Sequence, residues 1–284
     1  MKKTIAAILC FLMLVIIFPT NIKADMGPKP SVVIDFSGLE GKSYYVTLLS
    51  YEESTGPYSA NNDYYDYLGD QDIFVKFSQY KDVDGHYFLG YYENCSATNK
   101  FAWTYYPPQK FKILIYLTES DSFIVSDQIE RYAFDSYYTA IITDYEGELS
   151  AQVGIDIVKS YDYTNEIISL VIRVILTITI ELVIAWLFGF RGKKVLGFIA
   201  ITNIATQILL NLVLNTTNYY SGMDTFIIFY VLLEVFVIAL EAMLYSKFLK
   251  KLAPDQKLVL YAFSSNLISF GLGMLLALWL PSIF

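Results

Sequence analysis

The sequence is poor in the side chains that carry most enzyme chemistry. It contains one histidine, His86, and two cysteines, Cys10 and Cys95. A serine–histidine triad would need a nucleophile elbow such as G-x-S-x-G, and that motif is absent, as are H-E-x-x-H and the paired-cysteine spacing of zinc sites. We therefore assign no catalytic residue, no metal ligand and no cofactor, and we favour a function other than catalysis.

Internal disulfide bonds are not expected either. Cys10 lies in an N-terminal apolar run that follows two lysines and ends in a polar stretch, which is the pattern of a secretory signal peptide cleaved after Ala24. An uncleaved membrane anchor is the alternative. Without residues 1–24, Cys95 has no partner in the chain. The following domain must then fold by core packing, and its length of about 140 residues is sufficient for that.

Charged residues are scarce and unevenly distributed. They make up 17% of the chain, against 55% hydrophobic residues, which is a balance typical of membrane proteins. Residues 25–165 contain 22 acidic and 9 basic side chains, whereas residues 166–284 contain 6 and 8. This asymmetry predicts two domains. The acidic first domain also argues against nucleic acid as a partner, because nucleic acid requires a basic surface.

Residues 25–165 predict a β-sandwich-like extracellular domain. Short segments rich in aromatic and β-branched residues are separated by turn sequences, and one short helix is expected at Asp72–Tyr80 with Asp70 as its N-cap. The expected strands are Ser31–Phe36, Tyr44–Leu49, Tyr87–Tyr92, Phe101–Tyr106, Phe111–Leu117, Phe123–Ile129 and Tyr137–Thr143.

Two features of this domain have a functional and a structural interpretation. Its many tyrosines are compatible with a surface for sugars, peptides or cell-wall polymer, but tyrosine is also common on half-exposed strands, and we favour that explanation. The segment from Asp82 to Gly85 is similar to the start of a calcium-binding loop. Its sixth position is Tyr87 rather than glycine, so a simple turn explains the segment better.

Four apolar segments near the C-terminus are long enough to span a bilayer, which requires about 20 residues. Lysine and arginine occur in the first and third connections between them, whereas the middle connection, Asn215–Thr225, has none. The positive-inside rule then predicts a four-helix transmembrane bundle over residues 166–284 in a cell membrane, with the N-terminal domain and the C-terminus extracellular. The expected spans are Ile167–Phe190, Val195–Leu214, Phe226–Phe248 and Leu258–Leu280.

These spans contain polar residues that are costly in a bilayer and usually face a bundle interior. Several recur at intervals of four or seven and therefore share a helical face. From the ends of the apolar runs, we expect Glu181, Asn203, Glu234 and Asn266 to share a layer near the middle of the membrane. Glu241 is expected nearer the cytoplasm. The full intramembrane polar cluster is Arg173, Glu181, Asn203, Gln207, Asn211, Glu234, Glu241 and Asn266.

One arginine cannot neutralise three glutamates, so at least one glutamate is expected to be protonated near neutral pH. Two interpretations of the cluster remain. Interhelical hydrogen bonds of about 0.6–2 kcal/mol each would simply hold the bundle together. A path for protons or cations would explain why glutamates occur in place of amides.

Taken together, the sequence resembles an uncharacterised family of predicted membrane proteins from anaerobic Gram-positive bacteria. The resemblance covers nearly the whole chain and implies the same architecture, with no activity attached. It rests on the amide ladder of Asn203, Gln207 and Asn211 and on five motifs: Asp25–Pro30, Ser54–Pro57, Tyr105–Pro108, Glu130–Phe134 and Leu187–Arg191.

Two functions follow as expectations. The first is ligand binding or sensing at the cell envelope, with the acidic, tyrosine-rich domain coupled to the polar transmembrane bundle and the signal passed to a membrane partner. The second is proton- or cation-coupled transport through a homo-oligomer, because four spans are few for a transporter. An intramembrane hydrolase is disfavoured, since no span contains the histidine that usually assists a catalytic acid.

Overall fold

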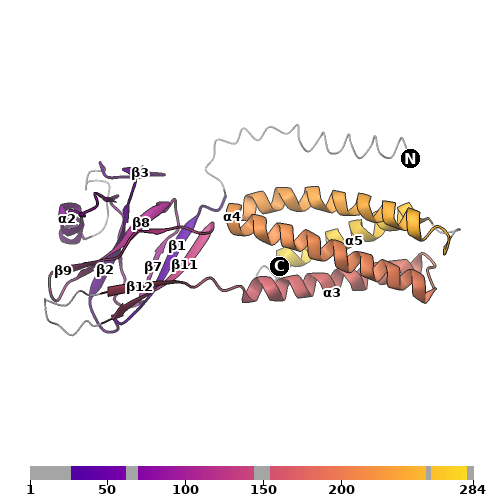
Figure 1. The fold of residues 1–284 in the computed structure, drawn as a ribbon, viewed down its shortest axis with the longest axis horizontal. Coiled ribbons are helices and arrows are strands. Elements are labelled where there is room, and N and C mark those ends of the chain that lie inside the picture. Colours follow the sequence, from indigo (N-terminus) through magenta and orange to yellow (C-terminus); the bar gives the residue numbers. More distant parts are fainter. Residues whose placement is uncertain (1–26, 62–69, 144–153, 254–256, 280–284) are drawn as a thin grey trace.

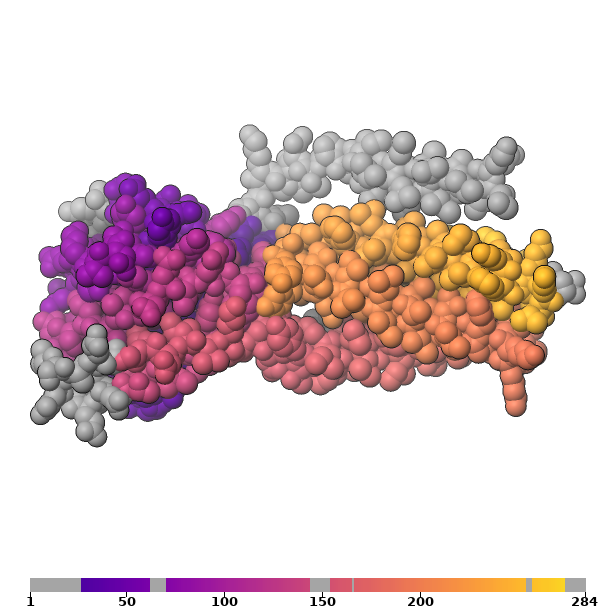
Figure 2. Space-filling view, in the orientation of Figure 1, coloured from indigo at the N-terminus to yellow at the C-terminus, as the bar shows by residue number. Residues whose placement is uncertain are grey.

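The computed structural model describes residues 27–61, 70–143, 154–253 and 257–279, so the expected signal peptide, residues 1–24, lies outside the described residues. A β-rich N-terminal part is followed by a C-terminal region of apolar helices (Figure 1). The two parts meet end to end, and the helical region extends away from the sheets as an elongated body (Figure 2).

The strands of the β-rich part form two larger sheets and one small hairpin. In chain order they are β1 (Ser31–Ser37), β2 (Tyr44–Ser50), β3 (Ser54–Thr55), β4 (Tyr58–Ser59), β5 (Tyr87–Phe88), β6 (Glu93–Asn94), β7 (Lys100–Trp103), β8 (Lys110–Leu117), β9 (Ser122–Val125), β10 (Ile129–Glu130), β11 (Asp135–Thr143) and β12 (Gly154–Lys159).

The first larger sheet has the order β12-β11-β1-β7. Strand β1 runs parallel to β11, with Ser31 opposite Asp135, and antiparallel to β7. The second has the order β10-β8-β2-β5, with β6 also paired to β2 and β9 to β8. The hairpin of β3 and β4 turns at Gly56 and Pro57.

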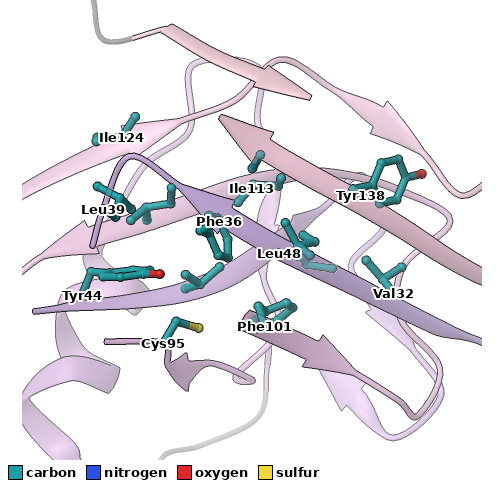
Figure 3. Close-up of a cluster of buried hydrophobic side chains, with 14 of the residues drawn as sticks. Val32, Phe36, Leu39, Tyr44, Leu48, Cys95, Phe101, Ile113, Ile124 and Tyr138 are labelled. Atoms are coloured by element: carbon teal, nitrogen blue, oxygen red, sulfur yellow. The ribbon is translucent and has the colours of Figure 1, made fainter. Parts of the chain in front are cut away.

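Both larger sheets contribute to one hydrophobic cluster. Strand β1 alternates, so that Val32, Ile34 and Phe36 are buried while Asp35 between them is exposed. Figure 3 shows Phe36 beside Leu48 of β2, within a cluster that also receives side chains from β7, β8 and β11. The period-two pattern that predicted β1 therefore reflects one face on this core and one face outward.

Strand β8 is covered on both faces. Phe111, Ile113 and Ile115 belong to the shared cluster, whereas Leu114 belongs to a second cluster formed with helix α2 (Gln71–Gln79). Because side chains alternate along a strand, Lys112 points to the α2 side with Leu114. A lysine in the middle of β8 is thus inside the molecule, at 5% exposure.

The expected strands Ser31–Phe36, Tyr44–Leu49, Phe111–Leu117 and Tyr137–Thr143 are confirmed, with small differences at their ends. Helix α2 is confirmed as well, and the carboxylate of its N-cap accepts a hydrogen bond of 3.0 Å from the backbone N–H of Asp72.

Three expected strands are too long. Tyr87–Tyr92 is interrupted at Gly90, whose φ is +85°. Phe101–Tyr106 ends at Trp103, and Phe123–Ile129 is divided between β9 and β10. Strand β12 was missed altogether. It lies at the edge of its sheet and is short, and its apolar alternation is limited to Ile155 and Ile157, which pack against the shared cluster.

The helical region consists of α3 (Thr164–Leu187), α4 (Lys193–Phe248) and α5 (Leu258–Trp279). Helices α3 and α4 are long and apolar enough to cross a membrane, and both have a window with a mean hydropathy of 2.5. Helix α4 is broken at Gly222, where φ is 76° and ψ is −179°. Its two halves turn back on each other there and lie side by side (Figure 1).

The connection expected at Asn215–Thr225 does contain the reversal, at Gly222, but it is much shorter than expected because helix occupies the rest of this range. Its polar residues were typical of a loop. In the structure, however, the hydroxyls of Thr216 and Thr217 donate to the backbone carbonyls of Leu212 and Val213, four residues earlier in the same helix.

The helical region carries its polar residues inside and its apolar residues outside. The side chains of Glu181 and Glu241 are fully buried, whereas Leu187 is 68% and Ile201 is 69% exposed. Only 11% of the most apolar window of α3 and 17% of that of α4 is buried within the described structure. A core helix of a water-soluble protein shows the opposite arrangement.

The β-rich part contacts the helices at the break in α4. The backbone N–H of Phe134, between β10 and β11, donates to the carbonyl of Tyr219 at 2.8 Å. The Phe134 ring also lies against Gly222, so closely that an added Cβ would come within 2.7 Å of it. Around this contact lies a group of mutually contacting rings that we term the tyrosine junction: Tyr132, Tyr161, Tyr163 and Tyr219.

The covalent connection between the two parts is short. Strand β12 ends at Lys159 and α3 begins at Thr164. Within this connection, the Tyr161 hydroxyl donates to the Glu166 carboxylate at 2.5 Å, and the Ser160 backbone N–H donates to the carbonyl of Tyr137 at 3.0 Å. The two parts are therefore joined tightly at this point.

Candidate functional site

The buried polar side chains of the helices converge in one place, which we term the polar core. It contains residues from α3, from both halves of α4 and from α5, joined by hydrogen bonds or close approach. Its members are Glu181, Asn203, Thr206, Glu241, Tyr245 and Asn266, and each is at most 4% exposed.

Glu241 is the best-connected member of the polar core. One carboxylate oxygen accepts from the Thr206 hydroxyl at 2.7 Å, and the other accepts from the Asn266 amide at 2.7 Å and from the Tyr245 hydroxyl at 3.3 Å. The Tyr245 hydroxyl in turn accepts from the Asn203 amide at 3.3 Å. This network joins the two halves of α4 to α5. A buried carboxyl is most stable where such donors surround it.

Glu181, on α3, lies at the same level but has different surroundings. Neither of its carboxylate oxygens has a hydrogen-bond partner among the described residues. Asn203 and Ser265 approach the carboxyl without meeting the geometry of a hydrogen bond, and Tyr261 donates to the backbone carbonyl of Glu181 rather than to its side chain. The buried carboxyl is therefore surrounded by polar neighbours that leave its oxygens unsatisfied.

The remaining predicted residues lie toward the β-rich part. Gln207 and Asn211 are buried, as expected for the amide ladder, and the Asn211 amide donates to the Gln207 backbone carbonyl at 2.8 Å. Glu234 is 6% exposed and one of its oxygens has no partner among the described residues. Arg173 lies over the Phe226 ring, with its Cζ atom 6.0 Å from the ring centroid.

The expected depths were wrong for two glutamates. Glu241 lies level with Asn203 and Asn266 rather than beyond them, and Glu234, expected in that layer, lies nearer the β-rich part. The first half of α4 runs to Ser221 instead of ending at Leu214, so Asn203 is nearer one end of its helix than the apolar run indicated. Thr206 was not identified from the sequence. Its position three residues after Asn203, on the same helical face, was the available signal.

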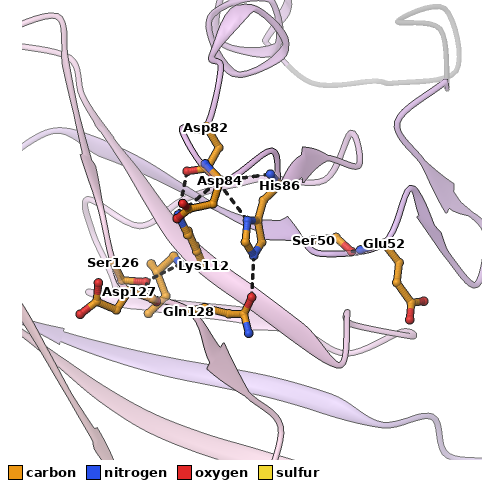
Figure 4. A network of polar contacts seen from close by, with 10 residues as sticks. Ser50, Glu52, Asp82, Asp84, His86, Lys112, Ser126, Asp127 and Gln128 are labelled. Carbon is orange, nitrogen blue, oxygen red and sulfur yellow. Dashed lines mark hydrogen bonds and ion pairs between the residues drawn. The ribbon is translucent and has the colours of Figure 1, made fainter.

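A second polar network lies in the β-rich part (Figure 4). The Lys112 ammonium is 3.0 Å from one oxygen of the fully buried Asp82 carboxylate and also contacts the carboxylate of Asp84. The lysine thus occupies the place between these two acids where a cation would be held in a calcium loop. The turn predicted at Asp82–Gly85 is confirmed by a 3.2 Å hydrogen bond from the Gly85 N–H to the Asp82 carbonyl.

The charges of this network stabilise one another. Burial acts to raise the pKa of Asp82, but hydrogen bonds from Lys112 and His86 outweigh it and hold the pKa below its usual value. For Lys112, burial acts to lower the pKa, and the contacts with Asp84 and Asp82 outweigh it, so the pKa is raised. Lys112 was missed from the sequence, although a single lysine within the apolar run Phe111–Leu117 was a visible signal.

Neither His86 nor Cys95 is placed for catalysis. The two ring nitrogens of His86 lie 3.0 Å from Asp82 Oδ2 and 3.1 Å from Gln128 Oε1, which leaves neither nitrogen available to a nucleophile. Cys95 is completely buried in the shared core, and burial raises the pKa of its thiol to about 12. A thiol in that state is unreactive near neutral pH.

The polar core thus remains the candidate site, with no catalytic arrangement among the described residues. Comparison of the chain with models of protein families and with curated proteins finds no match.

Proposed function

We propose that the chain is an integral membrane protein of the cell envelope. Its helical region would be a four-helix transmembrane bundle formed by α3, the two halves of α4 and α5, and its β-rich part an extracellular sandwich. The observation that supports this is the inverted burial of the helices, in which carboxyls and amides are inside and leucine and isoleucine side chains face outward.

The distribution of charge supports the proposed orientation. The two ends of the helical region differ, because one end contacts the β-rich part and the other carries the basic connections (Figure 1). Arg191, Lys193 and Lys194 lie at the connection between α3 and α4. Lys247, Lys250, Lys251 and Lys257 lie at the connection between α4 and α5, at the same end of the helical region. Such positive charge is retained in the cytoplasm. Tyrosine is enriched at both boundaries between a bilayer and water, so the tyrosine junction suits the boundary at the end away from the basic connections.

Cysteine labelling tests this orientation. In intact cells, a membrane-impermeant maleimide is expected to label Val83→Cys, at a position 92% exposed in the β-rich part, and to spare Lys250→Cys until the cells are permeabilised. The parent chain provides the control, because Cys95 is fully buried. The reverse pattern would refute the orientation. Release of the chain from membranes by alkaline carbonate would refute membrane insertion.

Within this architecture we favour ligand binding or sensing by the β-rich part, with the signal passed to the polar core. One observation carries this proposal: the loop between β10 and β11 packs directly on the break in α4. A displacement of Phe134 would reach both halves of α4 at once, since they join at Gly222 and carry Asn203 and Glu241. Both connections at the basic end are short, so the signal would pass to another membrane protein or a second copy of the chain.

Hydrogen exchange of the full chain in lipid nanodiscs tests the relay. Phe134→Ala is expected to reduce the protection of backbone amides beside Asn203 and Glu241, although neither residue contacts Phe134, because the variant loosens the packing on Gly222. Val83→Ala is the control, since this exposed side chain lies away from the helices. Equal exchange near Asn203 and Glu241 in Phe134→Ala and Val83→Ala would show that the two parts respond independently.

A second function, proton- or cation-coupled transport by an oligomer, is favoured by a different observation. Glu181 carries two buried oxygens without hydrogen-bond partners among the described residues, an arrangement that is costly unless it serves to bind and release a positive charge. Flux across liposomes that contain the purified protein, lost in Glu181→Gln, would favour transport. An equal leak in both proteins would exclude it.

A further inference from the structure

The polar core has a surplus of hydrogen-bond acceptors. The unsatisfied side-chain atoms in it, among the described residues, are both carboxylate oxygens of Glu181, Oδ1 of Asn203 and Oδ1 of Asn266. All three side chains have 0% exposure, so bulk water does not reach these oxygens. Buried polar atoms nearly always have a partner, and a group of oxygens without one indicates a bound donor, which is a water molecule, a proton or a cation. The carboxylate of Glu181 favours the proton or the cation, because water alone leaves its charge buried and uncompensated.

The orientation of the two amides is fixed by their nitrogen atoms. Nδ2 of Asn203 donates to the Ile199 carbonyl at 3.0 Å and to the Tyr245 hydroxyl. Nδ2 of Asn266 donates to Glu241 at 2.7 Å and to the Ala262 carbonyl at 2.9 Å. Turning the Asn203 amide around would set its oxygen against the Ile199 carbonyl, and turning the Asn266 amide around would set its oxygen against the Ala262 carbonyl and Glu241. The two amide oxygens are therefore the atoms without hydrogen-bond partners, and rotating the amides does not remove this deficit.

The unsatisfied atoms belong to side chains that adjoin one another. Asn203 approaches the Glu181 carboxyl, and Asn203 and Asn266 are joined through Tyr245 and Glu241. They come from three helices, α3, α4 and α5, so their convergence does not result from the geometry of a single helix. Other titratable groups facing Glu181 are Glu234, Glu241 and Tyr245 of α4 and Tyr261 of α5.

The composition of this group specifies the ligand. All the unsatisfied atoms are carboxylate or amide oxygens, which bind hard cations and exclude anions. Among the described residues, no set of three or more acidic, histidine or cysteine side chains is placed to hold a metal ion, which argues against a divalent or transition metal. We infer that Glu181, Asn203 and Asn266 form a buried site for one monovalent cation, either a proton carried on Glu181 or a sodium ion.

This inference goes beyond the proposed sensing role and does not depend on it. A cation at this site would neutralise Glu181 and connect α3 to the network that already joins α4 and α5. Loss of the cation would leave a buried carboxylate beside Glu241, which is unfavourable. The packing of α3 against the other helices is then expected to depend on cation or proton concentration.

Carbodiimide labelling of the full chain in detergent micelles tests the site. Dicyclohexylcarbodiimide modifies protonated carboxyls in apolar surroundings, and mass spectrometry of the peptides locates the product. Near neutral pH in choline chloride, we expect modification at Glu181. If sodium is the ligand, replacing choline by sodium at equal ionic strength should reduce this modification at least tenfold. If a proton is the ligand, sodium should have no effect, and modification should fall as the pH rises.

Thermal unfolding gives a second measurement, because a ligand that binds the folded state raises the unfolding midpoint. A sodium site predicts a higher midpoint in sodium than in choline for the parent chain and for the control Glu119→Gln, whose side chain is exposed in the β-rich part. Glu181→Gln should lose the difference. Absence of modification at Glu181 from about pH 5 to 9 in both salts, with identical midpoints, would overturn the inference. The labelling of the parent chain tests the proposed site even if Glu181→Gln does not fold.

Discussion

Replacing Lys112 with methionine is expected to lower the free energy of unfolding of the β-rich part by about 3–5 kcal/mol. Methionine matches the length of the lysine stem, so the change removes the charge with little loss of packing. The fully buried Asp82 carboxylate would keep its contacts with His86 but lose its only close ammonium among the described residues. The large effect comes from leaving a charge buried without a countercharge.

Denaturant unfolding in detergent, followed by the fluorescence of the buried Trp103, measures this effect when Trp186 and Trp279 are replaced by phenylalanine. Lys100→Met is the matched control. The Lys100 ammonium is 3.5 Å from an Asp35 carboxylate, but both side chains are about half exposed, so the loss should be at most about 1 kcal/mol. Similar effects of Lys100→Met and Lys112→Met would contradict the prediction. Adding Asp82→Leu to Lys112→Met should recover part of the stability, because the unpaired charge is then removed.

The pH dependence of the same transition has a defined sign. In the parent chain the pKa of Asp82 is lowered, so its contribution to stability is present above about pH 4, the unfolded value, and is lost as the pH falls through the folded pKa. In Lys112→Met, only the hydrogen bonds from His86 still oppose burial, so the pKa of Asp82 should be higher than in the parent chain. The difference in stability between the two proteins should therefore shrink as the pH is lowered from 7 toward 4.

Replacing Gly222 with valine is expected to destabilise the helical region by about 2–5 kcal/mol. The backbone angles of Gly222 lie in a region that only glycine adopts readily, and a Cβ there would come within 2.7 Å of the Phe134 ring. Both the strain and the collision act at the point where α4 reverses direction. The variant should unfold at lower denaturant in mixed micelles and lose the contact between the two parts.

Gly197→Ala is the matched control for this change, because Gly197 lies in the first half of α4 and nothing comes within 4 Å of an added Cβ. Alanine favours helix over glycine by up to about 1 kcal/mol, so this variant should be neutral or more stable. If Gly222→Val behaves like Gly197→Ala, the break in α4 does not depend on glycine. Combining Gly222→Val with Phe134→Ala should relieve the collision while the backbone strain remains.

Sequence periodicity predicted the elements whose environment is simple. Strand β1 has one face on the core and one outward, and the apolar runs at Ile167–Phe190 and Leu258–Leu280 correspond closely to α3 and α5. Prediction from periodicity failed where the polarity of a residue disagreed with its surroundings in the folded protein. Most polar residues of Asn215–Thr225 lie in helix, where the hydroxyls of Thr216 and Thr217 donate to backbone carbonyls of the preceding turn. Lys112 is buried where two acids from a distant turn reach it.

The candidate site shows the same limit. The sequence identified Glu181, Asn203, Glu241 and Asn266 as residues that avoid lipid, and all four are fully buried. Whether each of them has a hydrogen-bond donor depends on how the two halves of α4 pack together, and these halves meet at Gly222. Spacing along one helix carries no information about such contacts between helices.

The parallel pairing of β1 with β11 bears on how the chain is made. Strand β1 cannot gain this neighbour until about a hundred further residues have left the ribosome, since Ser31 pairs with Asp135. The same sheet is completed by β12, which leads almost directly into α3. The sheet can therefore be completed only when the first long apolar helix is about to leave the ribosome.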